Sequence, residues 1–264
     1  MYLIDYHIHS NNSFDSKETI MSVCEAAIEK GINEICFTEH FSVKKGLKSH
    51  GFLNLKKYSD EIRECRELFK DKLTIRAGIE ICEPHENEEE LKVVLENIPF
   101  DFILGSVHNF DYNVSLIAYM NGNSKEESYK RYFKEVNKVC TSPYIDVIAH
   151  LDLMKRYAFN LHGNYDFKDY KEEIEEVLKN IINAKKGIEV NTSTLRSMVN
   201  ETMPSIDILK MYYDLGGEII TVGSDSHKAE DVGAGIRESI EVLKAIGFKH
   251  VYIFEGRQAI PVEI

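Results

Sequence analysis

The chain has 264 residues and is acidic, with 32 lysines and arginines against 44 aspartates and glutamates and a formal net charge of −12. This charge argues against a nucleic-acid-binding surface, and no apolar stretch approaches the roughly 20 residues needed to cross a bilayer. Hydrophobic residues make up 43% and charged residues 29%, as in an ordinary globular protein. Five cysteines without a Cys-x-x-Cys pair, and a start without a basic signal-peptide region, predict a cytoplasmic protein with reduced thiols.

Short apolar runs typical of strands alternate with helical patterns along the whole chain. The runs expected to form strands are 2–5, 34–37, 73–79, 101–104, 145–149, 187–190, 218–222 and 250–254. The first helical stripe lies between the first two runs, and Gly31 is expected to end it. Its apolar positions, three or four residues apart, are Ile20, Val23, Cys24 and Ala27. Four further stripes begin at Tyr58, Ile174, Ile206 and Ile236.

The alternation of strand and helix predicts an α/β fold with parallel strands covered by helices. Seven or eight such units fit a (β/α) barrel better than an open sheet. No linker rich in Pro, Ser or Gly divides the chain, so residues 1–264 are expected to form a single domain. The irregular stretch 109–124 is expected to lie as a loop over one face, before a polar helix around 125–140. This loop and the segment 157–170 could also form a lid or an interface.

Polar side chains mark the ends of the first seven predicted strands, and function in such a barrel collects at the carboxyl ends of the strands. Six of the ten histidines fall at these ends. The strand-end residues are His7, His9, His40, Glu80, His108, His150, Asn191, Asp225 and His227. The other four histidines, which are expected to be structural or exposed, are His50, His85, His162 and His250.

His7 and His9 are two residues apart on a strand, so both imidazoles face the same side and can reach one ion. Asp225 and His227 repeat this spacing with a carboxylate and an imidazole. Neutral imidazole suits zinc, iron and manganese, and carboxylates can bridge two ions. Six histidines with several acids exceed the needs of one ion, so the sequence predicts a multinuclear metal site. It leaves the identity of the metal open.

The strand-end residues occur in motifs that resemble those of the polymerase and histidinol phosphatase (PHP) family. In the family's order, the motifs are His7-Ile8-His9-Ser10, Thr38-Glu39-His40, Gly78-Ile79-Glu80, Gly105-Ser106-Val107-His108, His150-Leu151-Asp152 and Ser224-Asp225-Ser226-His227. They span nearly the whole chain and are most similar to those of stand-alone histidinol-phosphate phosphatases. The resemblance implies the PHP fold, a distorted TIM-like (β/α)7 barrel, and a centre of three divalent metal ions.

The resemblance also implies a set of ligands for each ion. The first ion would be held by His7, His9, Glu80 and Asp225. Glu80 would bridge to a second ion, which His108 and His150 would also hold. The third ion would be held by Asp15, His40 and His227. Asp15 has an alternative role, because an aspartate can cap a helix and one is expected to begin near Ser16.

Two arginines follow predicted strands where loops could fold over the site: Arg156 after the fifth and Arg196 after the sixth. The planar guanidinium can bind two phosphate oxygens, and similar arginines bind phosphate in the phosphatases that the chain resembles. A plain surface arginine is the alternative for either. Ser10 and Asn191 are expected to add hydrogen bonds. Asp152 is expected to accept a hydrogen bond behind the ligands, with orientation of His150 or protonation of the leaving group as alternatives.

These features together predict metal-dependent hydrolysis of L-histidinol phosphate to L-histidinol and phosphate, a step of histidine biosynthesis. Two close metals can lower the pKa of a bridging water, and the resulting hydroxide would attack phosphorus in line. One alternative is another PHP phosphoesterase, acting on nucleotides, sugar phosphates or phosphotyrosine. More distant alternatives are a metal-dependent deaminase or amidohydrolase and a non-enzymatic metal-binding protein. Neither a nucleic acid nor a membrane is expected as a partner, and the oligomeric state stays open.

Overall fold

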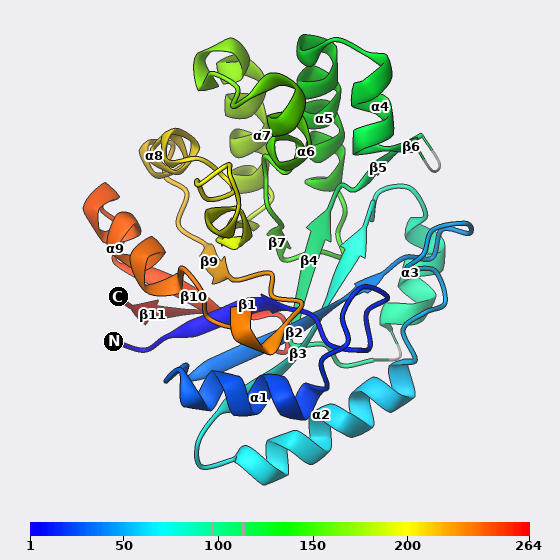
Figure 1. The fold of residues 1–264 in the computed structure, drawn as a ribbon, viewed down its shortest axis with the longest axis vertical. Helices are drawn as coiled ribbons and strands as arrows, with labels where there is room; N and C mark the ends of the chain where they lie inside the picture. Colours follow the sequence, from blue (N-terminus) through cyan, green and yellow to red (C-terminus); the bar gives the residue numbers. More distant parts are fainter. Residues whose placement is uncertain (97, 112–113) are drawn as a thin grey trace.

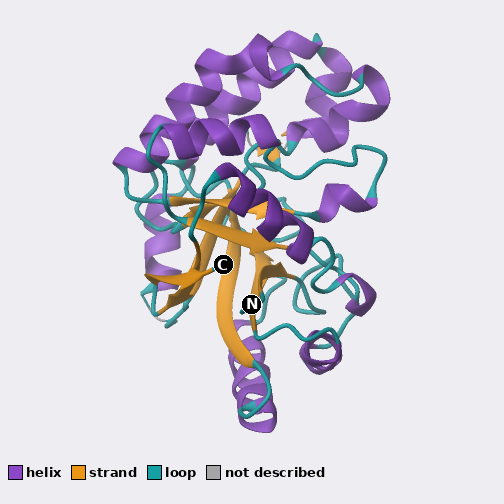
Figure 2. Cartoon of the chain, turned by 90° about the vertical axis from the view of Figure 1, so that its left-hand side faces the viewer, coloured by secondary structure: helices purple, strands orange, loops and turns teal. Residues whose placement is uncertain are grey.

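The computed structural model describes residues 1–96, 98–111 and 114–264. Within them, one sheet has seven parallel strands in the order β1-β2-β3-β4-β7-β8-β9. The strands are β1 (Ile4–Ile8), β2 (Glu34–Phe41), β3 (Thr74–Cys82), β4 (Phe102–Ser106), β7 (Val147–Ile148), β8 (Gly187–Asn191) and β9 (Ile220–Gly223). A bridge between Ile8 and Ser226 joins the two edges, so the sheet nearly closes (Figures 1 and 2). The predicted distorted (β/α)7 barrel is confirmed.

The barrel strands are buried on both faces, which explains why they appear in the sequence as short apolar runs. Every residue of β1 and of β2 is buried. The strands extend beyond several of the predicted runs at their carboxyl ends, because polar residues there also take part in the sheet. In the register between β2 and β3, His40 lies beside Glu80. Strand pairing alone therefore brings two predicted ligands from different strands together.

Nine α-helices occur in the described residues and surround the strands (Figure 2). They are α1 (Ile20–Glu29), α2 (Leu55–Phe69), α3 (Glu88–Leu95), α4 (Leu116–Gly122), α5 (Lys125–Val139), α6 (Met154–His162), α7 (Lys171–Asn183), α8 (Ile206–Asp214) and α9 (Ile236–Ile246). The predicted stripe of α1 is the buried side of that helix, and the hydroxyl of Thr19 caps its first turn. Among the described residues, no helix is both long enough and apolar enough to cross a membrane.

The stretch 109–124 differs from the loop that the sequence predicted. Its described part forms the hairpin strands β5 (Asn109–Phe110) and β6 (Val114–Ser115) and then α4, while residues 112–113 lie outside the described residues. The short helix forms because the Ser115 side chain accepts a hydrogen bond from the backbone of Ala118, and Leu116 and Met120 are buried. The run 250–254 also differs from the others. It lies in β10 (His250–Glu255), which pairs with β11 (Gln258–Glu263) as a separate antiparallel hairpin.

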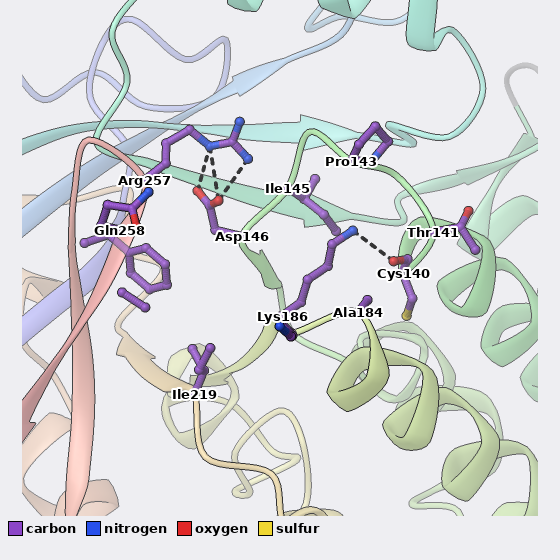
Figure 3. Close-up of a pocket in the computed structure, with 13 residues that line it drawn as sticks. Cys140, Thr141, Pro143, Ile145, Asp146, Ala184, Lys186, Ile219, Arg257 and Gln258 are labelled. Carbon is purple, nitrogen blue, oxygen red and sulfur yellow. Dashed lines mark hydrogen bonds and ion pairs between the residues drawn. The ribbon is translucent and has the colours of Figure 1, made fainter.

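The amino-terminal ends of β7, β8 and β9 border a cavity of about 640 Å³ (Figure 3). Arg257, from the turn between β10 and β11, lies 2.9 Å from a carboxylate oxygen of Asp146, which precedes β7. Lys186 donates hydrogen bonds to the carbonyl oxygens of Cys140 and Ser142, at the end of α5. Both cations are paired with groups of neighbouring structural elements. We therefore look for the functional site at the opposite, carboxyl end of the barrel strands.

Candidate metal centre

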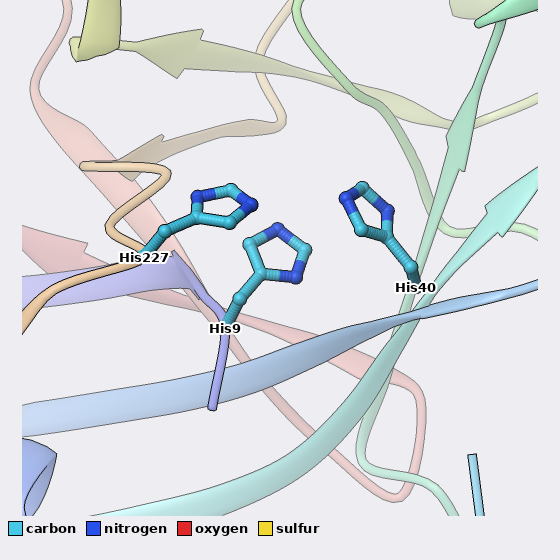
Figure 4. Close-up of side chains that lie close together, drawn as sticks. All are labelled: His9, His40 and His227. Carbon is cyan, nitrogen blue, oxygen red and sulfur yellow. The ribbon is translucent and has the colours of Figure 1, made fainter. Parts of the chain in front are cut away.

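The predicted ligands converge at the carboxyl ends of the barrel strands. They border or lie beneath a cavity of about 510 Å³. Predicted ligands in its lining are Asp15, His40, His108, His150, Asp225 and His227. The remaining three, His7, His9 and Glu80, are wholly buried. Figure 4 shows the rings of His9, His40 and His227, from three separate parts of the chain, turned toward one another. The structure therefore brings all nine predicted ligands to one site.

Glu80 lies among the histidines and uses both of its carboxylate oxygens. Oε2 is 2.8 Å from Nδ1 of His40 and 3.5 Å from Nε2 of His7. Oε1 is 3.0 Å from Nε2 of His150 and 3.6 Å from Nε2 of His108. Burial would raise the pKa of Glu80, but the surrounding histidines hold that pKa well below its usual range. An ionised carboxylate with its two oxygens facing different imidazoles is suited to bridging two cations.

His7 and His9 form a second part of the site with Asp225. Their Nε2 atoms are 3.0 Å apart, and these atoms lie 3.7 Å and 3.5 Å from Oδ1 of Asp225. Two imidazole nitrogens and a carboxylate oxygen that converge in the interior form a suitable donor set for a divalent cation. This geometry agrees with the spacing argument: His7 on β1 and His9, directly after its end, point to the same side.

Asp15 lies between two histidines rather than at a helix terminus. Its Oδ2 is 3.3 Å from Nε2 of His40 and 3.4 Å from Nε2 of His227. The alternative role as a helix cap does not apply, because α1 begins at Ile20 and Thr19 caps it. The three side chains form the group that the family resemblance implied for a third ion.

Glu189 on β8 contacts two of the predicted ligands, and the sequence argument did not select it. Its Oε1 lies 2.6 Å from Nδ1 of His7, and its Oε2 accepts a hydrogen bond of 2.7 Å from the backbone of His150. A carboxylate on the far nitrogen of a histidine fixes the orientation of the ring. The sequence does contain a pattern that indicates Glu189: it is two residues before the selected Asn191, so the two side chains lie on the same side of the strand.

Arg156 lies where the sequence predicted, in the lining of the cavity. It donates a hydrogen bond of 2.9 Å to Oδ2 of Asp225 and another to the hydroxyl of Ser193. Lys48, in the loop after β2, lines the same cavity and was not selected from the sequence. These two side chains are the arginine and the lysine of the described cavity lining.

The structure does not bring the other predicted phosphate-binding residues to the cavity lining. Arg196 donates to the carbonyl oxygen of Ser224 at 2.9 Å and pairs with Asp231 at 3.3 Å. The hydroxyl of Ser10 donates to Glu39. Asn191 is buried and donates to Glu189 at 3.3 Å. None of these three side chains borders the described cavity, so their placement does not support direct contact with a substrate.

Asp152 is also absent from the described cavity lining. It is wholly buried, and its Oδ2 accepts a hydrogen bond from the hydroxyl of Tyr165 at 2.8 Å. Its contacts are to Tyr165, Lys155 and Ser205, so the placement gives no support to orientation of His150 or to proton donation to a leaving group.

Comparison with known proteins agrees with this geometry. The family model of the PHP domain matches residues 5–193. The chain belongs to the PHP domain family. A histidinol-phosphatase of Lactococcus lactis subsp. lactis is 31% identical over 264 residues, covering 97% of this chain and 96% of the relative. A protein of Clostridium acetobutylicum named "Probable histidinol-phosphatase" is 30% identical over 259 residues, covering 97% of this chain and 98% of the relative.

A solved structure is similar to this PHP chain over almost its full length. The histidinol phosphate phosphatase of Lactococcus lactis, crystallised with zinc, L-histidinol and phosphate, superposes with a TM-score of 0.88 at 30% identity. The match covers 98% of each chain. Together with the converging imidazoles and carboxylates, this similarity supports divalent metal binding by the PHP chain at the site around Glu80.

Proposed function

We propose that this protein is a histidinol-phosphatase that hydrolyses L-histidinol phosphate to L-histidinol and phosphate in histidine biosynthesis. The observation that carries the proposal is the convergence of the nine predicted metal ligands, Glu80 among them, in a chain similar over its full length to the Lactococcus lactis enzyme. That relative was crystallised with zinc and with both products of this reaction.

The donor set supports three divalent ions in the groups that the family resemblance implies. Glu80 would be shared between the first group, with His7 and His9, and the second, with His108 and His150. Divalent ions at such a site lower the pKa of water and neutralise the negative charge of a phosphate. The donor types suit zinc, iron and manganese, and zinc is the metal in the solved relative.

Residues of the chain itself would bind and orient the phosphate ester. The Arg156 guanidinium is held at the cavity by Ser193 and Asp225, which reduces the entropy that binding has to overcome. A guanidinium can bind two phosphate oxygens, whereas the ammonium group of Lys48 adds a single positive charge. With divalent ions bound beside these two cations, the local charge would favour an anionic substrate although the chain as a whole carries −12.

Other phosphate monoesters remain the second candidate, because these groups recognise phosphate and do not by themselves select the alcohol. Basic groups beside the metal donors give less support to a deaminase or an amidohydrolase, whose substrates need no phosphate contact. The proposal includes a single domain, supported by one continuous hydrophobic core, and a cytoplasmic location, supported by five cysteines that form no disulfide.

Phosphate release from histidinol phosphate, measured beside a panel of nucleotides, sugar phosphates and phosphotyrosine, tests the function. We expect the highest kcat/KM for histidinol phosphate, and loss of turnover in His9→Ala with the fold retained by circular dichroism. Metal analysis of the purified wild type is expected to find two to three ions per chain. Equal rates across the panel would refute the substrate assignment, and full activity in His9→Ala would refute the metal assignment.

A further inference from the structure

A polar cluster with a buried centre and a partly exposed edge lies beneath the start of α6, behind the metal cavity. Its members are Asp152, Lys155, Tyr165 and Glu201, and we refer to them as the α6 anchor. Lys155 is wholly buried, and its Nζ lies 3.0 Å from Oδ2 of Asp152 and 2.9 Å from Oε2 of Glu201. It also donates a hydrogen bond of 2.6 Å to the carbonyl oxygen of Thr202. A buried ammonium is costly unless it is paired in this way, so these contacts constrain the surrounding backbone.

Asp152 connects three segments of the chain through one carboxylate oxygen. Besides Lys155, Oδ2 accepts hydrogen bonds from the hydroxyl of Tyr165 at 2.8 Å and from the backbone of Ser205 at 3.3 Å. The turn after β7, the segment after α6 and the loop before α8 therefore meet at Asp152. Because the residue does not line the cavity, its effect on the site must pass through this backbone.

The same turn carries two groups of the metal centre. His150 begins it with a φ angle of 26°, which is uncommon for a residue with a side chain. The hydroxyl of Tyr132 donates to the carbonyl oxygen of His150 at 3.3 Å and accepts from the backbone of Leu153 at 3.2 Å. Arg156 follows Lys155 directly, so the anchored lysine fixes the backbone from which the guanidinium reaches the cavity.

We propose that Asp152 and Lys155 are positioning residues, which set the affinity for phosphate by holding the start of α6 so that Arg156 faces the metal cavity. Neither residue touches the substrate. The inference rests on the proposed function for its kinetic readout, and on phosphate binding alone for a second readout that needs no catalysis. Substitutions in the α6 anchor should therefore change the affinity for phosphate only while Arg156 is present.

The test compares Asp152→Asn and Tyr165→Phe in the metal-loaded enzyme. We expect each to raise KM for histidinol phosphate and Kd for inorganic phosphate, by about tenfold for Asp152→Asn and less for Tyr165→Phe, with kcat within about twofold. In an Arg156→Ala background, the same substitutions should cause little further change, because interacting positions are not additive.

Tyr129→Phe is the matched control. The Tyr129 ring lies 4.8 Å from that of Tyr165, and its hydroxyl has no hydrogen-bond partner within the described part of the chain. We expect its KM and Kd to equal those of the wild type. Fully additive effects of Asp152→Asn and Arg156→Ala, or a lower melting temperature with unchanged Kd in Tyr165→Phe, would overturn the inference. If histidinol phosphate is not a substrate, the Kd for inorganic phosphate still decides whether Asp152 and Lys155 position Arg156.

Discussion

The Nδ1 atom of His7 lies 2.6 Å from Oε1 of Glu189, and this contact leaves Nε2 of His7 facing His9 and Glu80. The other oxygen of Glu189 accepts a hydrogen bond from the backbone of His150. One buried carboxylate on β8 thus orients one donor on β1 and one that follows β7. Such contacts behind the ligands tune metal affinity nearly as strongly as some of the ligands do.

Glu189→Gln should weaken metal binding without removing a ligand. The amide keeps the size of the side chain but loses the charge that holds the His7 ring, so we expect an affinity loss of about tenfold or more. Competition with a chelator, together with the metal content per chain, measures this. Glu172→Gln, at an exposed position on α7, is the control. An unchanged metal content at limiting metal in the Glu189 variant would contradict the assigned role.

Arg156→Ala and Arg196→Ala should have different effects, although the sequence suggested the same role for both. Arg156 lines the cavity, and loss of its charge-assisted hydrogen bonds should raise KM for the phosphate ester by about 10- to 100-fold. Arg196 is held by Asp231 and the Ser224 carbonyl, so its removal should change KM by less than about threefold. Steady-state kinetics separate the two outcomes. A larger KM effect at Arg196 would show that it reaches the substrate.

Lys48→Met should weaken substrate binding modestly. The side chain lines the cavity from an exposed loop, where a single cation contributes little in water, so we expect KM to rise about two- to fivefold with kcat preserved. The effect should decrease as salt concentration increases. Lys45→Met, in the same loop but outside the described cavity lining, is expected to behave as the wild type. Identical kinetics for the two variants would exclude Lys48 from phosphate binding.

The barrel could be predicted from the alternation of strands and helices, and eight of the nine predicted ligands from their positions at strand ends. Asp15 lies in a loop, and only the family resemblance implied it. Parallel strands place their carboxyl ends at one edge, so polar residues that end separate apolar runs must meet there. The sequence therefore predicts one site for residues as far apart in the chain as His7 and Asp225, which the structure brings to 3.7 Å. The short helix α4 was missed because its seven residues are too few to show a clear helical period.

The direction of a side chain after a strand could not be predicted in the same way. Arg196 follows β8, as the sequence indicated, but the short helical turn Ser193–Arg196 directs its guanidinium to Asp231. Lys48 lies in a loop whose path is fixed by a bridge between Ser42 and His50, a contact without a periodic signal. Loop paths depend on such tertiary contacts, so the phosphate contacts were less predictable than the metal donors.

Glu135 on α5 should make the stability of the fold dependent on acid pH. Burial would raise the pKa of this carboxyl, but hydrogen bonds from His85 and Lys138 lower it to about 2, from an ordinary value of 4.5. Because the pKa is lower in the folded state, the stabilisation is fully present above about pH 5 and is lost as the pH falls toward 2. Glu135→Gln removes it at every pH.

Thermal melting of the wild type and of Glu135→Gln from pH 7 to pH 3 measures this contribution. We expect the variant to melt about 3 °C lower at pH 7, with a difference that becomes smaller below pH 5 as the wild type loses its charged group. Metal loss in acid affects both proteins, so the comparison isolates the carboxylate. Glu126→Gln, at an exposed position of the same helix, should follow the wild type. A difference in melting temperature that stays constant from pH 7 to pH 3 would show that folding does not lower the pKa of Glu135.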